Sequence, residues 1–114
     1  MNREELLAFK PKRVKSVDIP GIGAVCLRVL TAREALALEV GLRQDRSTPE
    51  GMEGMVAVQL AAFICDESGV PLLSLDDAKQ LVGQWSANQI RVCIQHGADL
   101  NGLGETAVEE AGKN

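Results

Sequence analysis

The stretch VDIPGIGAVCLRVLTARE, residues 17–34, decides the fold. Apolar and polar residues alternate on both sides of its PGIG segment, and in a strand alternate side chains share one face of the sheet. Gly21 and Gly23 can adopt the positive φ angles that a tight reversal needs. The stretch therefore predicts a β-hairpin with these apolar positions: Val17, Ile19, Val25, Leu27 and Val29.

The end of this stretch predicts a helix over residues 31–43. In the segment TARE, the Thr31 hydroxyl can accept a hydrogen bond from the Glu34 amide while the Glu34 side chain reaches back, which is a capping box. One apolar stripe should face the core, and the other either packs in the core as well or faces a partner. The two stripes are Ala35, Leu38 and Leu42 on one side, and Leu36 and Val40 on another.

Three more helices are predicted downstream. Residues 52–65 are apolar almost all round, as is typical of a helix at the centre of a fold. Ser74 and Ser86 each begin a capping box, completed by Asp77 and Gln89. The segment NG at residues 101–102 ends the last helix.

The predicted fold class is α+β, with an N-terminal β-hairpin followed by about four helices in a single domain, as suits a chain of 114 residues. We expect this domain to span residues 13–103. Residues 1–12 should form a flexible N-terminal arm, with a helical turn at residues 4–9. Residues 104–114 should form a flexible C-terminal tail, because they carry little apolar surface to bury.

The composition excludes several classes of function. A net charge of −4 argues against a nucleic-acid-binding protein, which needs a dense basic surface. No apolar run is long enough to cross a membrane, and the start of the chain lacks the pattern of a signal peptide. Three scattered cysteines are typical of a reduced, cytoplasmic protein. We therefore expect no nucleic acid and no membrane among the partners.

Four carboxylates between residues 64 and 82 raise the question of a calcium site. A calcium loop starting at Asp66 would need an oxygen ligand at its fifth position and glycine at its sixth, where Val70 and Pro71 stand. A purely structural alternative explains every residue: DESG forms a turn with Gly69 in a left-handed conformation, and the two aspartates of LDD begin a helix. We expect no metal.

The inventory of reactive residues also argues against an enzyme. His96 is the only histidine, and nothing in the sequence points to a group that would orient it as a base. The PGIG segment lies between two predicted strands, whereas a phosphate-binding loop opens a helix. We expect no catalytic residue and no cofactor. Trp85 either packs at a helix end or serves as a ligand platform, and with Leu36 and Val40 it completes the candidate partner-binding residues.

Two segments together carry a resemblance to a known family. Residues 17–38, VDIPGIGAVCLRVLTAREALAL, join an IPG-G hairpin to the start of a helix. Residues 56–103 follow an apolar helix with D-x-x-G-x-P-L, then an acidic-capped helix, then a helix ending in LNGL. In this order the chain resembles, over residues 14–103, the tail assembly chaperones of long-tailed (siphovirus-type) bacteriophages and prophages.

The resemblance implies a non-enzymatic assembly factor in the cytoplasm of the bacterial host, absent from the mature virion. Such chaperones bind the tape measure protein, help recruit tail tube subunits and self-associate, so a homo-oligomer is expected. The resemblance carries over no site residues. A small prophage adaptor or regulatory protein-interaction domain would use the same fold features and is the alternative, with an unrecognised small enzyme as a third class.

The same family implies a second, longer product. Its members often undergo a programmed −1 ribosomal frameshift near the end of the reading frame. Gly112, Lys113 and Asn114 can be encoded GGA-AAA-AAC, which contains the slippery run A-AAA-AAC. We expect a fraction of the product to continue past this segment into a second domain that contacts tube subunits, while the short form coats the tape measure protein.

Overall fold

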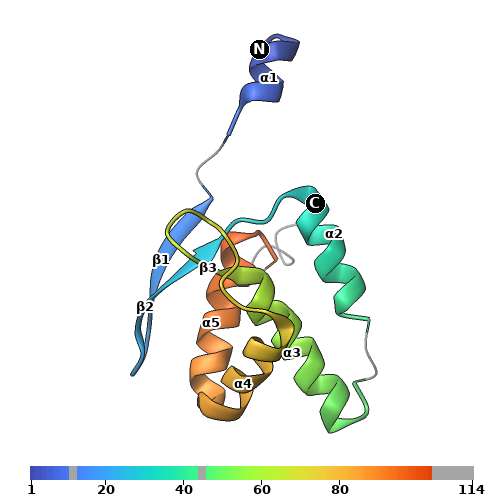
Figure 1. The fold of residues 1–114 in the computed structure, drawn as a ribbon, viewed down its shortest axis with the longest axis vertical. Coiled ribbons are helices and arrows are strands. Elements are labelled where there is room, and N and C mark those ends of the chain that lie inside the picture. Colours follow the sequence, from blue (N-terminus) through green and yellow to red (C-terminus); the bar gives the residue numbers. More distant parts are fainter. Residues whose placement is uncertain (11–12, 44–45, 104–114) are drawn as a thin grey trace, which may run out of the picture.

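The computed structural model describes residues 1–10, 13–43 and 46–103. A hairpin and four later helices form the body, as the α+β prediction required, and a short helix precedes them (Figure 1). In chain order the elements are α1 (Arg3–Ala8), β1 (Val14–Ile19), β2 (Gly23–Arg28), α2 (Ala32–Gly41), α3 (Pro49–Phe63), β3 (Ile64–Cys65), α4 (Leu75–Gln84) and α5 (Ala87–Leu100).

The predicted hairpin is present as β1 and β2, which pair in antiparallel register with Val17 opposite Val25. Gly21 and Gly23 take φ angles of 80° and 109° in the turn, as the reversal required. The alternation also holds, because Val17, Ile19 and Leu27 are buried. Val29 lies just beyond the end of β2.

A third strand was not predicted. We expected the apolar helix to continue to Cys65, but α3 ends at Phe63, and Ile64 and Cys65 form β3 against β2. Ile64 pairs with Leu27 and is extended, with φ −76° and ψ 127°. β3 forms in place of a last helical turn because its backbone pairs with the otherwise open edge of β2, and because both of its residues are buried. Cys65 also forms a bridge with Pro71.

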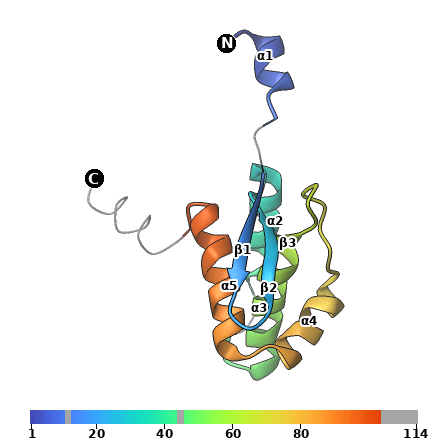
Figure 2. The same ribbon diagram turned by 90° about the vertical axis from the view of Figure 1, so that its left-hand side faces the viewer.

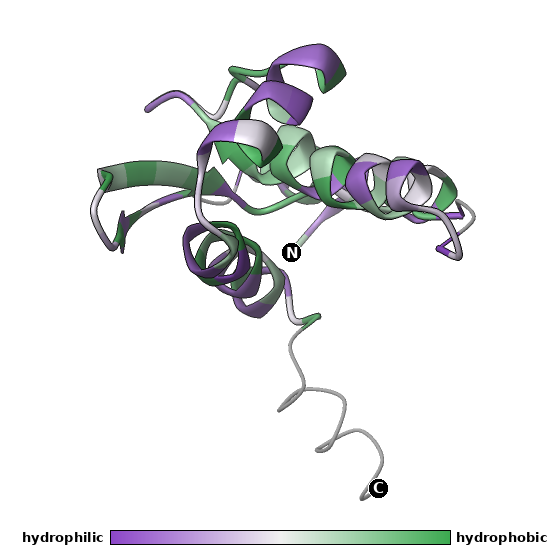
Figure 3. Ribbon diagram, turned by 90° about the horizontal axis from the view of Figure 1, so that it is seen from below, coloured by the Kyte–Doolittle hydropathy of each residue, from purple (hydrophilic) through white to green (hydrophobic). Residues whose placement is uncertain are grey.

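α3 is the central helix of the body, as its apolar sequence predicted. Its buried residues recur at every third position: Gly54, Ala57, Leu60 and Phe63. It packs against α2, α4 and α5. Its remaining apolar residues are half-buried, apart from Met52 near its start, which is 54% exposed. By contrast, α5 carries hydrophilic and hydrophobic residues side by side along its length (Figure 3).

Three predicted capping boxes are confirmed. In each, a hydroxyl accepts from the backbone N–H three residues later, at 3.1 Å, and that residue's side chain accepts from the capping N–H in return. The pairs are Thr31 with Glu34, Ser74 with Asp77, and Ser86 with Gln89. α2 ends at Gly41, slightly before the expected Arg43.

α5 lies along the hairpin and is bound to it at both ends (Figure 2). At its start, Gln89 Nε2 donates to the carbonyl of Pro20 in the hairpin turn, at 2.9 Å. At its end, Asn101 Oδ1 accepts from the Leu30 N–H at 2.7 Å, and Asn101 Nδ2 donates to the Arg28 carbonyl at 3.2 Å. These bonds hold α5 parallel to the sheet and fix its distance from α2, which follows Leu30.

α1 stands beyond the body, on the N-terminal side of β1 (Figures 1 and 2). Asn2 caps it by accepting from the Glu5 N–H at 2.8 Å, so the helical turn expected near residues 4–9 is present. None of its residues is buried, and Leu6, Leu7 and Phe9 are exposed. The predicted C-terminal tail, residues 104–114, lies outside the described residues.

Candidate partner-binding grooves

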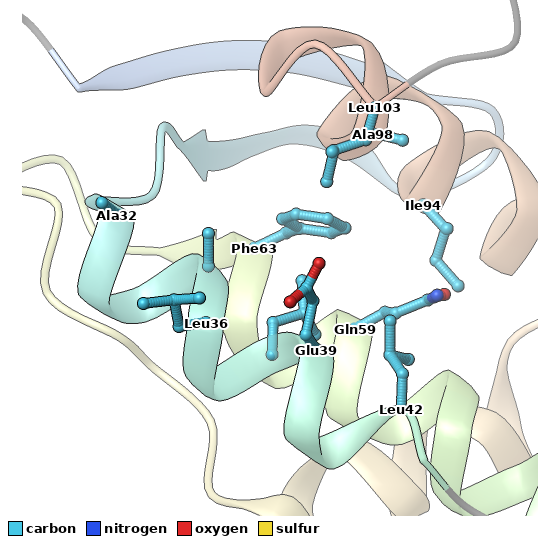
Figure 4. A pocket seen from close by; sticks show the side chains of 11 residues that line it. Ala32, Leu36, Glu39, Leu42, Gln59, Phe63, Ile94, Ala98 and Leu103 are labelled. Carbon is cyan, nitrogen blue, oxygen red and sulfur yellow. The ribbon is translucent and has the colours of Figure 1, made fainter. Parts of the chain in front are cut away.

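An open apolar groove of about 630 Å³ lies between α2 and α5, with α3 as its floor (Figure 4). We call it the α2–α5 groove. Its size is that of a ligand-binding pocket, and its lining is mostly aliphatic. The walls and floor are formed by Ala32, Ala35, Leu36, Leu38 and Glu39 of α2, by Leu42 directly after it, by Gln59 and Phe63 of α3, and by Ile94, Ala98 and Leu103.

The two apolar stripes of α2 have different environments. Leu38 is 6% exposed and packs in the core, with Leu42 against it. Leu36 and Val40 are 63% and 64% exposed, so the second stripe is not part of the core of this chain. Leu36 lines the α2–α5 groove, whereas Val40 lies outside it.

A second groove lies on the other side of α5. It has a volume of about 590 Å³ and is formed by residues of α3, α4 and α5, together with Trp85 between α4 and α5. We call it the α4–α5 groove. It shares Ile94, Ala98 and Leu103 with the α2–α5 groove. The candidates Leu36 and Trp85 therefore belong to two neighbouring apolar surfaces on either side of one helix.

The floor and far wall of the α2–α5 groove were not identified from the sequence. Phe63 belongs to the helix that was predicted to be central, and periodicity alone gives no sign that one edge of its ring faces a groove. Ile94 was placed correctly on the apolar face of α5, but that face is shared between the core and both grooves. Gly97 has no side chain, which lets α5 lie directly against Phe63.

The start of α2 is fixed by a hydrogen-bonded network around Arg28. Arg28 Nε donates to the Ala62 carbonyl at 2.7 Å, and its guanidinium pairs with Glu34. The Thr31 backbone N–H donates to Glu34, and this bond, together with Arg28, lowers the pKa of Glu34 although partial burial acts in the opposite direction. The network ties β2, the start of α2 and the end of α3 together, so it anchors the α2 wall of the groove at its N-terminal end.

Charges in the two grooves differ. Among the described residues that line the α2–α5 groove, Glu39 is the only ionisable one, and its side chain points into the space between α2 and α5 (Figure 4). In the α4–α5 groove the ionisable residue is Arg91, whose Nη2 donates to Asn88 Oδ1 at 2.7 Å.

Two cysteine thiols among the described residues are buried in the core. Burial raises the pKa of Cys93 to about 11, so its thiol is protonated at neutral pH, while His96 one turn later is exposed. Burial also raises the pKa of Cys65. Within the part of the chain that the structure describes, no group of three or more His, Cys, Asp or Glu residues is arranged to hold a metal ion.

The acidic loop after β3 has a structural explanation. Asp66 Oδ1 accepts from the N–H groups of Ser68 and Val70, at 2.8 and 3.0 Å, and Gly69 adopts a φ of 87°. The carboxylate therefore closes a turn.

None of the described helices combines the length and the apolar character that a membrane span requires.

The arrangement of a hairpin, a short third strand and four helices has a counterpart among solved structures. The solved structure of the bacteriophage HK97 tail assembly chaperone matches it with a TM-score of 0.53 and 21% sequence identity, covering 85% of this chain and 94% of that chain. The sequence matches no protein-family model. A search of curated proteins found no match.

Proposed function

We propose that this protein is a non-enzymatic tail assembly chaperone whose α2–α5 groove binds helical segments of the tape measure protein. The observation that carries the proposal is the groove itself: an apolar surface with Leu36 63% exposed, on a fold shared with a phage tail assembly chaperone. An amphipathic helix can place its apolar face in such a groove, which is a recurring mode of recognition. A long helical protein that lacks its binding partners would expose many apolar helix faces of this kind.

The proposed role extends to assembly partners. The α4–α5 groove and the exposed residues of α1 are further apolar surfaces, available to tail tube subunits and to other copies of this chain. We propose that the chaperone self-associates along the tape measure protein and helps recruit tube subunits. It then acts in the cytoplasm of the bacterial host and is absent from the mature virion.

Co-expression with the tape measure protein of the same phage tests this function. Tagged wild-type chain should retain the tape measure protein in the soluble fraction and co-purify with it. Leu36→Asp should reduce this recovery several-fold, because it places a charge in the groove wall. Met52→Asp is the control, since Met52 is also an exposed apolar residue but lies outside both grooves.

Equal recovery with Leu36→Asp and Met52→Asp would show that the α2–α5 groove is not the binding site. Capture of proteins other than tape measure and tube proteins would favour a prophage adaptor or regulatory domain.

The proposal of a longer, frameshifted product concerns residues 112–114, which lie outside the described residues, and reading the gene tests it. The absence of both a slippery run and an overlapping −1 frame would rule it out.

A further inference from the structure

Glu39 is the feature of the α2–α5 groove that apolar binding leaves unexplained. Its carboxylate lies among aliphatic residues, one helical turn from both Leu36 and Leu42. Its side chain forms no hydrogen bond or ion pair with any described residue. In Figure 4 it points into the groove rather than along the surface of α2.

An occupant of the groove would change the environment of this carboxylate. At present water solvates Glu39, but a helix seated on Leu36 and Phe63 would displace much of that water. A carboxylate that loses water without gaining a partner destabilises the complex, whereas one that gains a cation does not. The groove therefore favours an occupant that is apolar along its axis and positively charged at its side.

The shape of the groove favours a helix over a small molecule. Its α2 wall runs from Ala32 to Leu42, which at the rise of an α-helix is a length of about 15 Å, or nearly three turns. Small-molecule sites enclose most of their ligand. Here Leu36 in the wall is 63% exposed, so one side of any occupant would face solvent.

We propose that the α2–α5 groove selects amphipathic helices that carry a lysine or arginine one turn from their apolar anchor residues, and that Glu39 recognises this cation. The proposal rests on the proposed function, because it specifies the kind of tape measure segment that the groove binds. The described lining of the α4–α5 groove has no equivalent carboxylate, and its Arg91 is already paired with Asn88 on the same helix.

Two synthetic peptides of about 15 residues, long enough to form a helix, test the proposal. They share one leucine stripe and differ at a single flanking position, which is lysine in one and glutamate in the other. The Kd of the wild-type protein should be about tenfold lower for the lysine peptide than for the glutamate peptide. Glu39→Gln should abolish the preference and Glu39→Lys should reverse it. The preference should also shrink as ionic strength rises.

Two controls separate this proposal from the function on which it rests. Leu36→Asp should weaken the binding of both peptides, and Glu53→Gln, an exposed glutamate outside the groove, should leave the preference unchanged. Equal binding of both peptides to wild type, still lost in Leu36→Asp, would overturn the role of Glu39 and leave the groove as the binding site. Binding that is absent, or that does not depend on Leu36, would overturn both proposals.

Discussion

A Cβ atom on Gly97 would lie 2.4 Å from Cδ2 of Phe63, so α5 rests directly on the aromatic ring at the floor of the α2–α5 groove. Contacts this short do not occur between real side chains. Either the ring or the helix would have to move to admit even one methyl group. This contact therefore sets both the packing of the body and the width of the groove.

Gly97→Ala should destabilise the protein for this reason. Overpacking of a core costs about 1–3 kcal/mol, which in a domain of this size lowers Tm by roughly 4–8 °C per kcal/mol. Thermal unfolding followed by circular dichroism would measure it. Gly83→Ala is the control, because a Cβ at Gly83 on α4 meets nothing within 4 Å and the change should be neutral or stabilising. A Gly97→Ala protein as stable as wild type would show that Phe63 moves freely.

Glu34 should make stability depend on pH on the acid side. Its pKa in the folded protein is lowered from 4.5, chiefly by the backbone hydrogen bond from Thr31. The unfolded chain therefore takes up the proton first as pH falls. The contribution of Glu34 is complete above its unfolded pKa and is lost as pH falls through the folded one.

Glu34→Gln isolates this contribution, because glutamine can still accept the capping hydrogen bond. Urea unfolding between about pH 3 and pH 7 should show a shallower loss of stability on the acid side for the variant than for wild type. Superimposable slopes for the two proteins would contradict the prediction.

Asn101→Ala should loosen the junction between the hairpin and α2. The change removes the acceptor of the Leu30 N–H and the donor to the Arg28 carbonyl, and a backbone group left unpaired costs about 1–3 kcal/mol. Hydrogen exchange at the Leu30 amide should accelerate. Asn101→Asp keeps the acceptor oxygen and should preserve more of that protection, while Asn88→Ala at the exposed face of α5 should have no effect at Leu30. Unchanged exchange in Asn101→Ala would indicate that other contacts hold the junction.

Val58→Asp should be severely destabilising. The Val58 side chain lies where α3 meets α2, and its Cγ1 would be only 2.8 Å from a Cβ on Gly41. An unpaired charge packed into this contact costs several kcal/mol, against a total stability of about 5–15 kcal/mol. Met52→Asp, on the same helix but largely exposed, should have little effect on the urea midpoint. A soluble Val58→Asp protein with unchanged melting would mean that α3 is not central.

Self-association should be concentration-dependent and should involve the outer stripe of α2. Leu36 and Val40 are exposed large apolar residues that the body does not cover. Light scattering of the wild type should report a mass that rises with concentration, and Val40→Asp should raise the dissociation constant by about tenfold or more. A monomer from micromolar to millimolar concentration would contradict this.

Local signals in the sequence were sufficient to predict most of the helices and strands, because the information for each of these lies within a few residues. The capping boxes at Thr31, Ser74 and Ser86 and the glycine turn of the hairpin are of this kind. β3 was missed because its two residues read as the end of an apolar helix, and only pairing with Leu27, far away in the chain, makes them a strand.

The candidate site was predictable only in part, for a related reason. Periodicity divided α2 into two stripes but could not say which neighbours cover each one, and so left Leu36 and Val40 between core and surface. The groove is formed by three helices whose spacing depends on tertiary contacts, such as that of Gly97 with Phe63. No pattern within one helix reports that spacing.

The bond between Asn101 and the Leu30 N–H also bears on the order of events during synthesis. These residues are separated by 71 positions, so at translation rates of 5–20 residues per second the ribosome adds Asn101 roughly 4–14 s after Leu30. During that interval the hairpin lacks the helix that later lies along it, and α2 lacks the opposite wall of the groove. The α2–α5 groove therefore forms late, and a nascent chain cannot engage a partner there before α5 has emerged.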